Sequence, residues 1–185
     1  MLYVFKLNLE NPVVRRELGD VHMMHARIRE WFEGAQRRLL WRSDPTNGLL
    51  IVRGGSLATV PTGDYILSME MNKGRTKFEG DVKFALKANP TKTNGTQDGS
   101  NGQRVPVDPM KWLERKAGLC GFAISTLDKV KTGYVYGVRG GTMLTFFAAD
   151  YAGKLNVTDA ELFSQSIRAG IGPAKGYGFG LMICH

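Results

Sequence analysis

The chain has 185 residues, of which 25 are lysine or arginine and 17 are aspartate or glutamate, for a net charge of +8. This length is enough to bury one ordinary core or two small ones, and an apolar content of 43% excludes a wholly disordered protein. No uncharged apolar run approaches the roughly 18 residues that a membrane-spanning helix needs, so we exclude an integral membrane protein.

The first part of the chain alternates between extended and helical patterns. Residues 2–9 alternate as a β-strand does, and Asn11 followed by Pro12 is a typical helix start. A second helical pattern runs from about residue 21 to residue 33. Three strand patterns follow, the first two forming a hairpin around a turn that contains Pro, Asn and Gly: 39–42, 49–53 and 65–71.

The next segment predicts a strand with two different faces, followed by a loop. Apolar side chains at the even positions from 82 to 88 alternate with Lys83 and Lys87, which favours one apolar face and one lysine-bearing face. Residues 91–104 contain no hydrophobic side chain, so we expect a solvated loop there.

Two further helices are expected in the last part of the chain. An Asp-Pro pair begins a helix over 110–117 that a glycine ends, and Thr158 with Glu161 forms a capping box for a helix that Gly170 ends. The remaining strand patterns are 121–125, 133–139, 142–148 and 178–184.

The order of these elements predicts an α+β protein with two units, 1–78 and 79–185. We expect each unit to be a four-stranded antiparallel sheet with its helices on one face.

Positive charge is present in both halves of the chain. Up to residue 85 there are 13 basic and 10 acidic residues, and after it 12 and 7. This charge suits a polyanionic partner such as nucleic acid. It fits about equally well an enzyme that has a basic surface but no such partner. The two cysteines, Cys120 and Cys184, indicate a reducing compartment, so we expect a cytoplasmic protein. Three histidines are too few for a four-ligand zinc site, and we expect no metal and no cofactor.

Side chains that can move protons and hold phosphate gather on the helix predicted over 21–33. His25 lies at the edge of its apolar face, and His22 and Arg29 are its neighbours at i−3 and i+4. Imidazoles transfer protons near neutral pH and a guanidinium stabilises phosphate charge, which suits phosphodiester cleavage. The alternative is that His25 only packs against the core and His22 is exposed without a role.

A glycine-rich segment between the last helix and the last strand is the second candidate. Five of the eleven residues from 170 to 180 are glycine, which lets backbone amides approach phosphates closely. Lys175 and Tyr177 add a cation and a stacking ring, as single-stranded RNA contacts require. The alternative is that these glycines only cap the helix and form a tight turn.

Four segments in this order resemble the CRISPR-associated endoribonuclease of type I-E effector complexes, CasE. They read NPVVRRELGDVHMMH at 11–25, FALKANPTK at 84–92, WLERK at 112–116 and GIGPAKGYGFGL at 170–181. The resemblance covers roughly residues 1–33, 82–125 and 150–184.

The resemblance implies tandem ferredoxin-like, RRM-related domains that bind the stem-loop of a CRISPR repeat transcript. It implies cleavage at the 3′ base of the stem without a metal, the 2′-hydroxyl attacking the adjacent phosphate to leave a cyclic phosphate and a 5′-hydroxyl. The enzyme would then stay on the crRNA hairpin as a subunit of Cascade, together with the other Cascade subunits.

The resemblance places His25 on the family's catalytic histidine and 170–181 on its signature loop. We therefore expect His25, His22 and Arg29 to be catalytic. We expect RNA contacts from three residues of the loop and from basic side chains elsewhere: Gly172, Lys175, Tyr177, Arg15, Arg16, Lys83, Lys87, Lys92, Arg104, Arg115 and Lys116. For the strand lysines and the Arg115–Lys116 pair, the alternative is an ordinary solvated surface.

The chain departs from the family pattern at two positions. His22 stands where a tyrosine is common, and Pro173 stands where a basic residue is common. The alternative function is therefore a non-catalytic subunit that binds the RNA hairpin within a CRISPR effector complex.

Overall fold

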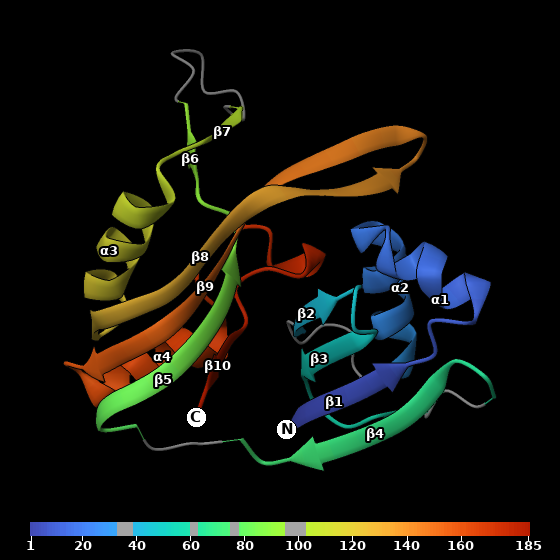
Figure 1. The fold of residues 1–185 in the computed structure, drawn as a ribbon, viewed down its shortest axis with the longest axis horizontal. Coiled ribbons are helices and arrows are strands. Elements are labelled where there is room, and N and C mark those ends of the chain that lie inside the picture. The colour runs from blue at the N-terminus through green and yellow to red at the C-terminus, as the bar shows by residue number, and fades with distance from the viewer. Residues whose placement is uncertain (33–38, 60–62, 75–77, 95–102) are drawn as a thin grey trace.

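The computed structural model describes residues 1–32, 39–59, 63–74, 78–94 and 103–185. Two four-stranded antiparallel sheets lie side by side, one from each half of the chain (Figure 1). Across the described residues, no helix combines the length and the apolar character that crossing a membrane requires.

The first sheet has the strand order β2-β3-β1-β4, with two helices packed on it. Its elements are β1 (Leu2–Leu7), α1 (Pro12–Leu18), α2 (Val21–Trp31), β2 (Leu40–Asp44), β3 (Leu49–Arg53) and β4 (Ile66–Asn72). The predicted helix start is confirmed, because the Asn11 side chain accepts a hydrogen bond from the Val13 backbone N–H at 2.9 Å. The predicted hairpin is also confirmed, as β2 pairs with β3.

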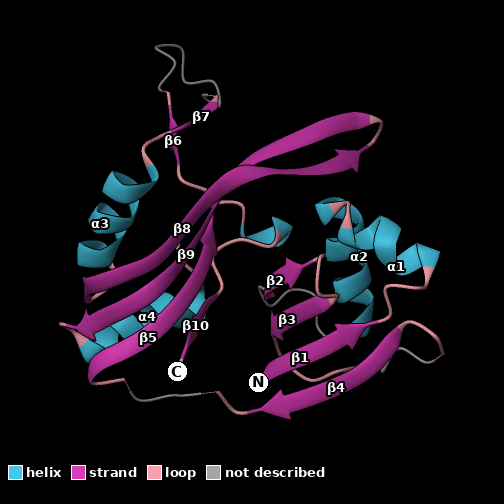
Figure 2. Ribbon diagram, in the orientation of Figure 1, coloured by secondary structure: helices cyan, strands magenta, loops and turns pink. Residues whose placement is uncertain are grey.

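The second sheet has the strand order β10-β5-β9-β8. Its unit consists of β5 (Gly80–Ala88), β6 (Thr91–Thr93), β7 (Arg104–Pro106), α3 (Pro109–Leu119), β8 (Phe122–Arg139), β9 (Thr142–Val157), α4 (Ala160–Ala169), the short 3-10 helix η1 (Lys175–Tyr177) and β10 (Met182–Cys184). Helices α3 and α4 cover one face of this sheet (Figure 2), where they bury the even-numbered side chains of β5. The predicted two-faced strand is thereby confirmed, with Lys83 and Lys87 on the opposite face.

The largest difference from the predicted elements is the ribbon formed by β8 and β9. The sequence predicts three short strands at 121–125, 133–139 and 142–148, whereas the structure has two long ones joined by a tight turn. Two irregularities in the pairing, at 124/126 and 127/129, interrupt the alternation that marks a strand in sequence. The far part of the ribbon leaves the sheet and reaches toward α2 (Figure 1).

Four smaller predictions were wrong at element ends. The expected loop at 91–104 begins and ends in the paired strands β6 and β7, while 95–102 lies outside the described residues. Helix α3 continues through the glycine expected to end it. Asp159, rather than Thr158, caps α4 by accepting from the Leu162 N–H at 2.9 Å. The last strand is only Met182–Cys184, because Gly178 and Gly180 have a φ of +85° and interrupt the extended backbone before it.

Each sheet has its own hydrophobic cluster. One gathers the apolar faces of β1, β3 and α2, and the other gathers those of β5, α3 and α4. Phe78 already belongs to the second cluster. The α+β class is confirmed, while the division of the chain into 1–78 and 79–185 stays a prediction.

Candidate active site

The two histidines of α2 and the glycine-rich loop come together, although about 150 residues separate them in the chain. The ring centroids of His22 and His25 both lie 6.4 Å from that of Tyr177. A Cβ built on Gly176 would lie 3.7 Å from Cε1 and Nε2 of His25. Helix α2 and η1 therefore form one site, which we call the histidine site (His22, His25, Gly176 and Tyr177).

Helix α2 holds the histidines in place through its buried face and its first turn. Val21, Met24, Ile28 and Trp31 are buried, as the periodicity predicts, which leaves both imidazoles half-buried at the rim. Asp20 caps the helix, accepting hydrogen bonds through Oδ1 from the backbone N–H groups of residues 22 and 23.

Asp20 also connects α2 to the long ribbon. Its Oδ2 accepts a hydrogen bond from the Val138 backbone N–H at 3.0 Å. A Cβ added to Gly137 would lie only 3.0 Å from Asp20 Oδ1, so glycine permits this close approach. Asp20 thus fixes β8 beside His22, a role that no local sequence pattern indicates.

Strand β2 supports η1 from the other side. Trp41 is buried, and its Nε1 donates to the Gly176 carbonyl at 3.3 Å. Gly178 has a φ of +85°, and a Cβ there would lie 2.9 Å from the Trp41 ring. Phe146 stacks on Tyr177 with 4.7 Å between the ring centroids. Trp41 and Phe146 were not predicted from the sequence, since packing between distant segments leaves no local signal.

The electrostatics favour a neutral His25. Burial lowers the pKa of His25, and the positive charge of Arg29 and the neighbouring His22 lower it further. Nδ1 of each imidazole is covered from solvent and has no hydrogen-bond partner among the described residues. The Nε2 edge of His25, which lies beside Gly176, is therefore the edge that can meet a substrate.

Alanine substitutions at two glycines of the loop should have different effects, one mainly on cleavage and the other mainly on the stability of the fold. Gly176→Ala places a methyl group at an ordinary van der Waals distance from His25, so we expect a stability loss below about 1 kcal/mol and a loss of cleavage of about tenfold. Gly172 has a φ of +88°, and its Cβ would lie 2.7 Å from the Trp112 ring. Gly172→Ala should therefore lower the free energy of unfolding by roughly 2–4 kcal/mol. Urea unfolding and cleavage rates of both variants check this, and a larger stability loss for Gly176→Ala would contradict it.

Other predicted residues occupy varied environments. Arg29 is exposed on α2, beside the histidine site. Arg15 donates through Nη1 to two backbone carbonyls of the preceding loop, at 2.7 and 2.9 Å. Lys175 donates to the Ala169 carbonyl at 2.8 Å, at the C-terminal end of α4. These bonds give Arg15 and Lys175 structural contacts in addition to any contact with RNA.

The remaining predicted residues are distributed over several surfaces. Arg16 is exposed on α1, Lys92 and Arg104 are exposed on β6 and β7, and Arg115 is exposed on α3. Lys116 lies over the Trp112 ring, 6.0 Å from its centroid. Arg104 lines a cavity together with Tyr177, while the structure does not bring the other four into one cluster with His25. The RNA contacts of all five stay predictions.

A cavity of about 520 Å³ adjoins Tyr177. Its lining includes Arg104, Tyr134, Phe146 and Tyr177, which combine a cation with aromatic rings. Such a lining suits an unstacked base next to a phosphate. In the described part of the chain, no three His, Cys, Asp or Glu side chains gather closely enough to hold a metal ion.

Comparisons with known proteins find relatives over nearly the whole chain. The family model described as "CRISPR associated protein" matches residues 2–185. A CRISPR-associated endoribonuclease, Cse3 of Thermus thermophilus, is 24% identical over 209 residues, covering 95% of each chain.

Solved structures share the fold over the whole chain. A structure of the CRISPR endoribonuclease Cse3 bound to a 19-nucleotide RNA has a TM-score of 0.81 at 24% identity, covering 100% of this chain and 99% of the other. Thermus thermophilus Cse3 bound to an RNA representing a pre-cleavage complex has a TM-score of 0.77 at 26% identity, covering 100% and 98%. The expected tandem ferredoxin-like, α+β fold is thereby confirmed.

Proposed function

Because the chain belongs to the family of CRISPR associated proteins, we propose that it is an endoribonuclease that cleaves CRISPR repeat transcripts at the 3′ base of a stem-loop. A curated relative that covers nearly the whole chain is an endoribonuclease, and a structural relative is bound to RNA before cleavage. The observation that carries the proposal is the meeting of His22 and His25 with the loop at Gly176 and Tyr177.

The proposed reaction is a transesterification within the RNA. The 2′-hydroxyl oxygen attacks the adjacent phosphorus, the bond from phosphorus to the 5′-oxygen breaks, and a 2′,3′-cyclic phosphate and a 5′-hydroxyl form. His25 accepts the proton of the 2′-hydroxyl, a role that suits an imidazole whose pKa is lowered. The ring centroid of His22 lies 6.4 Å from that of Tyr177. In this mechanism His22 returns a proton to the leaving 5′-oxygen, and Arg29 stabilises charge on the phosphate.

This mechanism predicts cleavage without a metal and a rise of the rate with pH. We expect full cleavage of the repeat hairpin in EDTA, and no cleavage of an RNA with a 2′-deoxy nucleotide at the scissile position. Only neutral His25 can accept a proton, so kcat/KM should rise with pH on the acidic side, as His25 loses its proton at a pKa below its ordinary value.

Three results would count against this mechanism. Cleavage that stops in EDTA excludes the metal-independent reaction, and cleavage of the 2′-deoxy RNA excludes attack by the 2′-hydroxyl. A kcat/KM that shows no rise with pH below about pH 6.5 would count against His25 as the proton acceptor.

We further propose that the protein stays on the cleaved hairpin, joins other Cascade subunits and acts in the cytoplasm. The resemblance to CasE supports this part of the proposal. After cleavage, the hairpin product should co-elute with the protein in size-exclusion chromatography, and product that elutes alone would contradict the proposal.

A further inference from the structure

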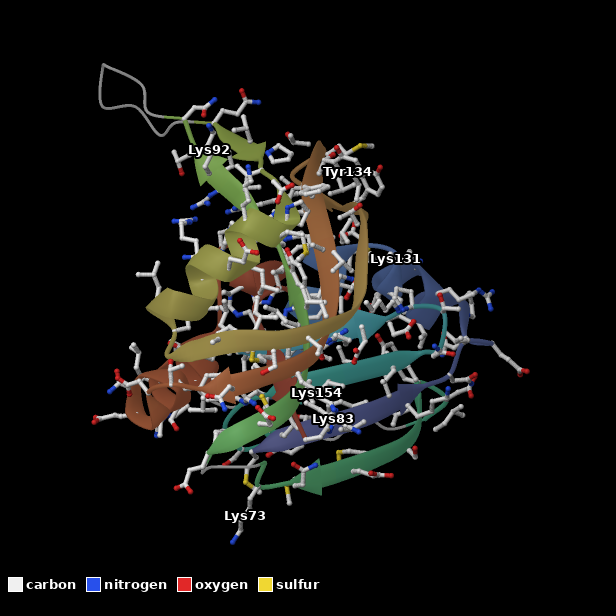
Figure 3. All side chains as sticks on the ribbon, turned by 60° about the vertical axis from the view of Figure 1, so that its left-hand side comes forward. Lys73, Lys83, Lys92, Lys131, Tyr134 and Lys154 are labelled. Atoms are coloured by element: carbon white, nitrogen blue, oxygen red, sulfur yellow. The ribbon has the colours of Figure 1, made fainter. Side chains whose placement is uncertain are left out.

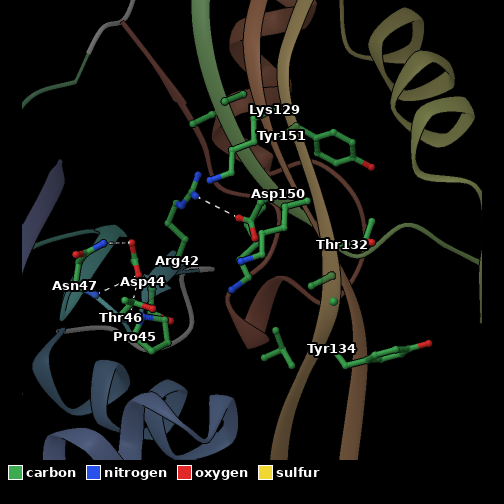
Figure 4. Close-up of a pocket in the computed structure, with 18 residues that line it drawn as sticks. Arg42, Asp44, Pro45, Thr46, Asn47, Lys129, Thr132, Tyr134, Asp150 and Tyr151 are labelled. Carbon is green, nitrogen blue, oxygen red and sulfur yellow. Dashed lines mark hydrogen bonds and ion pairs between the residues drawn. The ribbon is translucent and has the colours of Figure 1, made fainter.

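A second cavity, of about 550 Å³, lies between the two sheets, and we call it the basic cavity. Charged side chains line it from both units: Arg42, Asp44, Lys87, Lys129, Lys131 and Asp150. Four cations against two carboxylates leave an excess of positive charge in it. Figure 4 shows Arg42 reaching from β2 toward Asp150 on β9.

The floor of the basic cavity is the face of the second sheet that α3 and α4 leave open. On β9, Asp150 is paired with Lys87 of β5 on one side and with Lys131 of β8 on the other. In the next row of the same face, Ala152 lies between Ala85 and Lys129. The small side chains of Ala85 and Ala152 leave the floor hollow, with Lys87, Lys129 and Lys131 around it.

The open face extends beyond the cavity along β5 and β9. Lys83 of β5 is paired with Lys154 of β9, and both are exposed. Figure 3 shows Lys131 at some distance along the sheet from Lys154 and Lys83, which lie beside each other. A row of cations of this length fits several phosphates of one chain better than a single small anion.

Arg42 is incompletely paired within the protein. Its Nη2 donates to Asp150 at 3.4 Å, but its Nη1 is buried and has no hydrogen-bond partner among the described residues. Burial lowers the pKa of both Arg42 and Lys87, which indicates that the carboxylates do not fully replace the lost water. The Arg42 side chain is partly exposed, so it keeps in the cavity a positive charge that the protein compensates only in part.

The basic cavity is distinct from the histidine site. Trp41 carries the glycine-rich loop, and Arg42, the next residue of β2, points to the opposite side of that strand. An RNA bound in the cavity would therefore not need to occupy the histidine site.

We propose that the basic cavity and the lysine face beside it bind the sugar–phosphate backbone of single-stranded RNA outside the repeat hairpin. RRM sheets that read sequence stack bases on aromatic rings, whereas this floor presents lysine and alanine. The contacts therefore go to phosphates, and binding is independent of base sequence. The inference rests on the proposed function only in taking RNA as the source of the phosphate.

The test measures binding of a fluorescent single-stranded oligouridylate by anisotropy at several salt concentrations. Lys129→Met/Lys131→Met removes two exposed cations and keeps their stems, and should weaken binding about tenfold at 0.1 M salt. The slope of log K against log salt should become shallower by about 1.4, since each lost phosphate contact on a single strand counts about 0.7. Arg42→Met, checked for folding by thermal melting, should weaken binding similarly.

A charge-matched variant provides the control. Lys73→Met/Lys111→Met loses the same charge from exposed positions after β4 and on α3, and should change the affinity less than about twofold. Equal losses in the two double variants, or none in either, overturn the inference. Inorganic phosphate is added at a concentration equal to that of the phosphate groups of the RNA. If it displaces the RNA, the cavity binds a free anion rather than an RNA backbone, which overturns the inference.

Hairpin cleavage by the unaltered protein is measured separately. Cleavage without oligouridylate binding overturns the basic-cavity inference alone. Oligouridylate binding without cleavage overturns the proposed function alone.

Discussion

His25→Ala is expected to slow cleavage of the repeat hairpin by about 100-fold or more while leaving hairpin binding nearly unchanged. The imidazole is the group beside Gly176 that can take the 2′-hydroxyl proton, and alanine cannot replace it. Binding depends instead on many phosphate contacts, of which one neutral ring is a small part. Single-turnover cleavage, with the protein in excess of the RNA and above the dissociation constant, measures the cleavage step apart from binding.

His185→Ala is the matched control for this prediction. His185 is exposed beyond β10, and its substitution changes the same atoms far from α2 in the chain. We expect its cleavage rate to equal that of the parent. Equal rates for His25→Ala and the parent would remove His25 from the mechanism.

Trp41→Ala should lower the free energy of unfolding by roughly 3–5 kcal/mol and abolish cleavage at temperatures where the variant is still folded. The ring is buried against Gly178, and its removal leaves a cavity beneath η1. Without that support, Gly176 and Tyr177 lose their position beside His25. Urea unfolding and hairpin cleavage measure the two effects.

Conservative variants distinguish positioning from stability. Trp41→Phe keeps most of the packing but loses the hydrogen bond to the Gly176 carbonyl, which should cost about 1 kcal/mol and still slow cleavage. Trp112→Phe is the comparison, because Nε1 of Trp112 is buried without a hydrogen-bond partner among the described residues. A greater loss of cleavage in Trp112→Phe than in Trp41→Phe would show that the hydrogen bond to Gly176 does not position the site.

Features with a strong local period were predictable from sequence. The buried face of α2 follows from apolar residues at helical spacing, and that face alone determines where His22 and His25 emerge. The two faces of β5 follow in the same way from its alternation. Where pairing irregularities break the period, as in β8, the prediction divided one strand into two.

Contacts between distant segments were not predictable from one sequence. Nothing near Trp41 indicates a glycine loop 135 positions later, and nothing near Asp20 indicates a hydrogen bond to Val138. From the sequence, the glycines fit either a phosphate cradle or a helix cap and tight turn. In the structure, Gly172 and Gly178 are required by their φ angles and by tryptophan rings packed on them. Their contact with RNA stays a prediction.

The order of the parts along the chain has a consequence for biosynthesis. The proposed proton acceptor on α2, His25, is translated early, whereas η1, which lies beside it, is translated about 150 codons later. A polypeptide still on the ribosome therefore lacks one wall of the histidine site until the end of the chain is made. We expect translation products that end before η1 not to cleave the repeat hairpin.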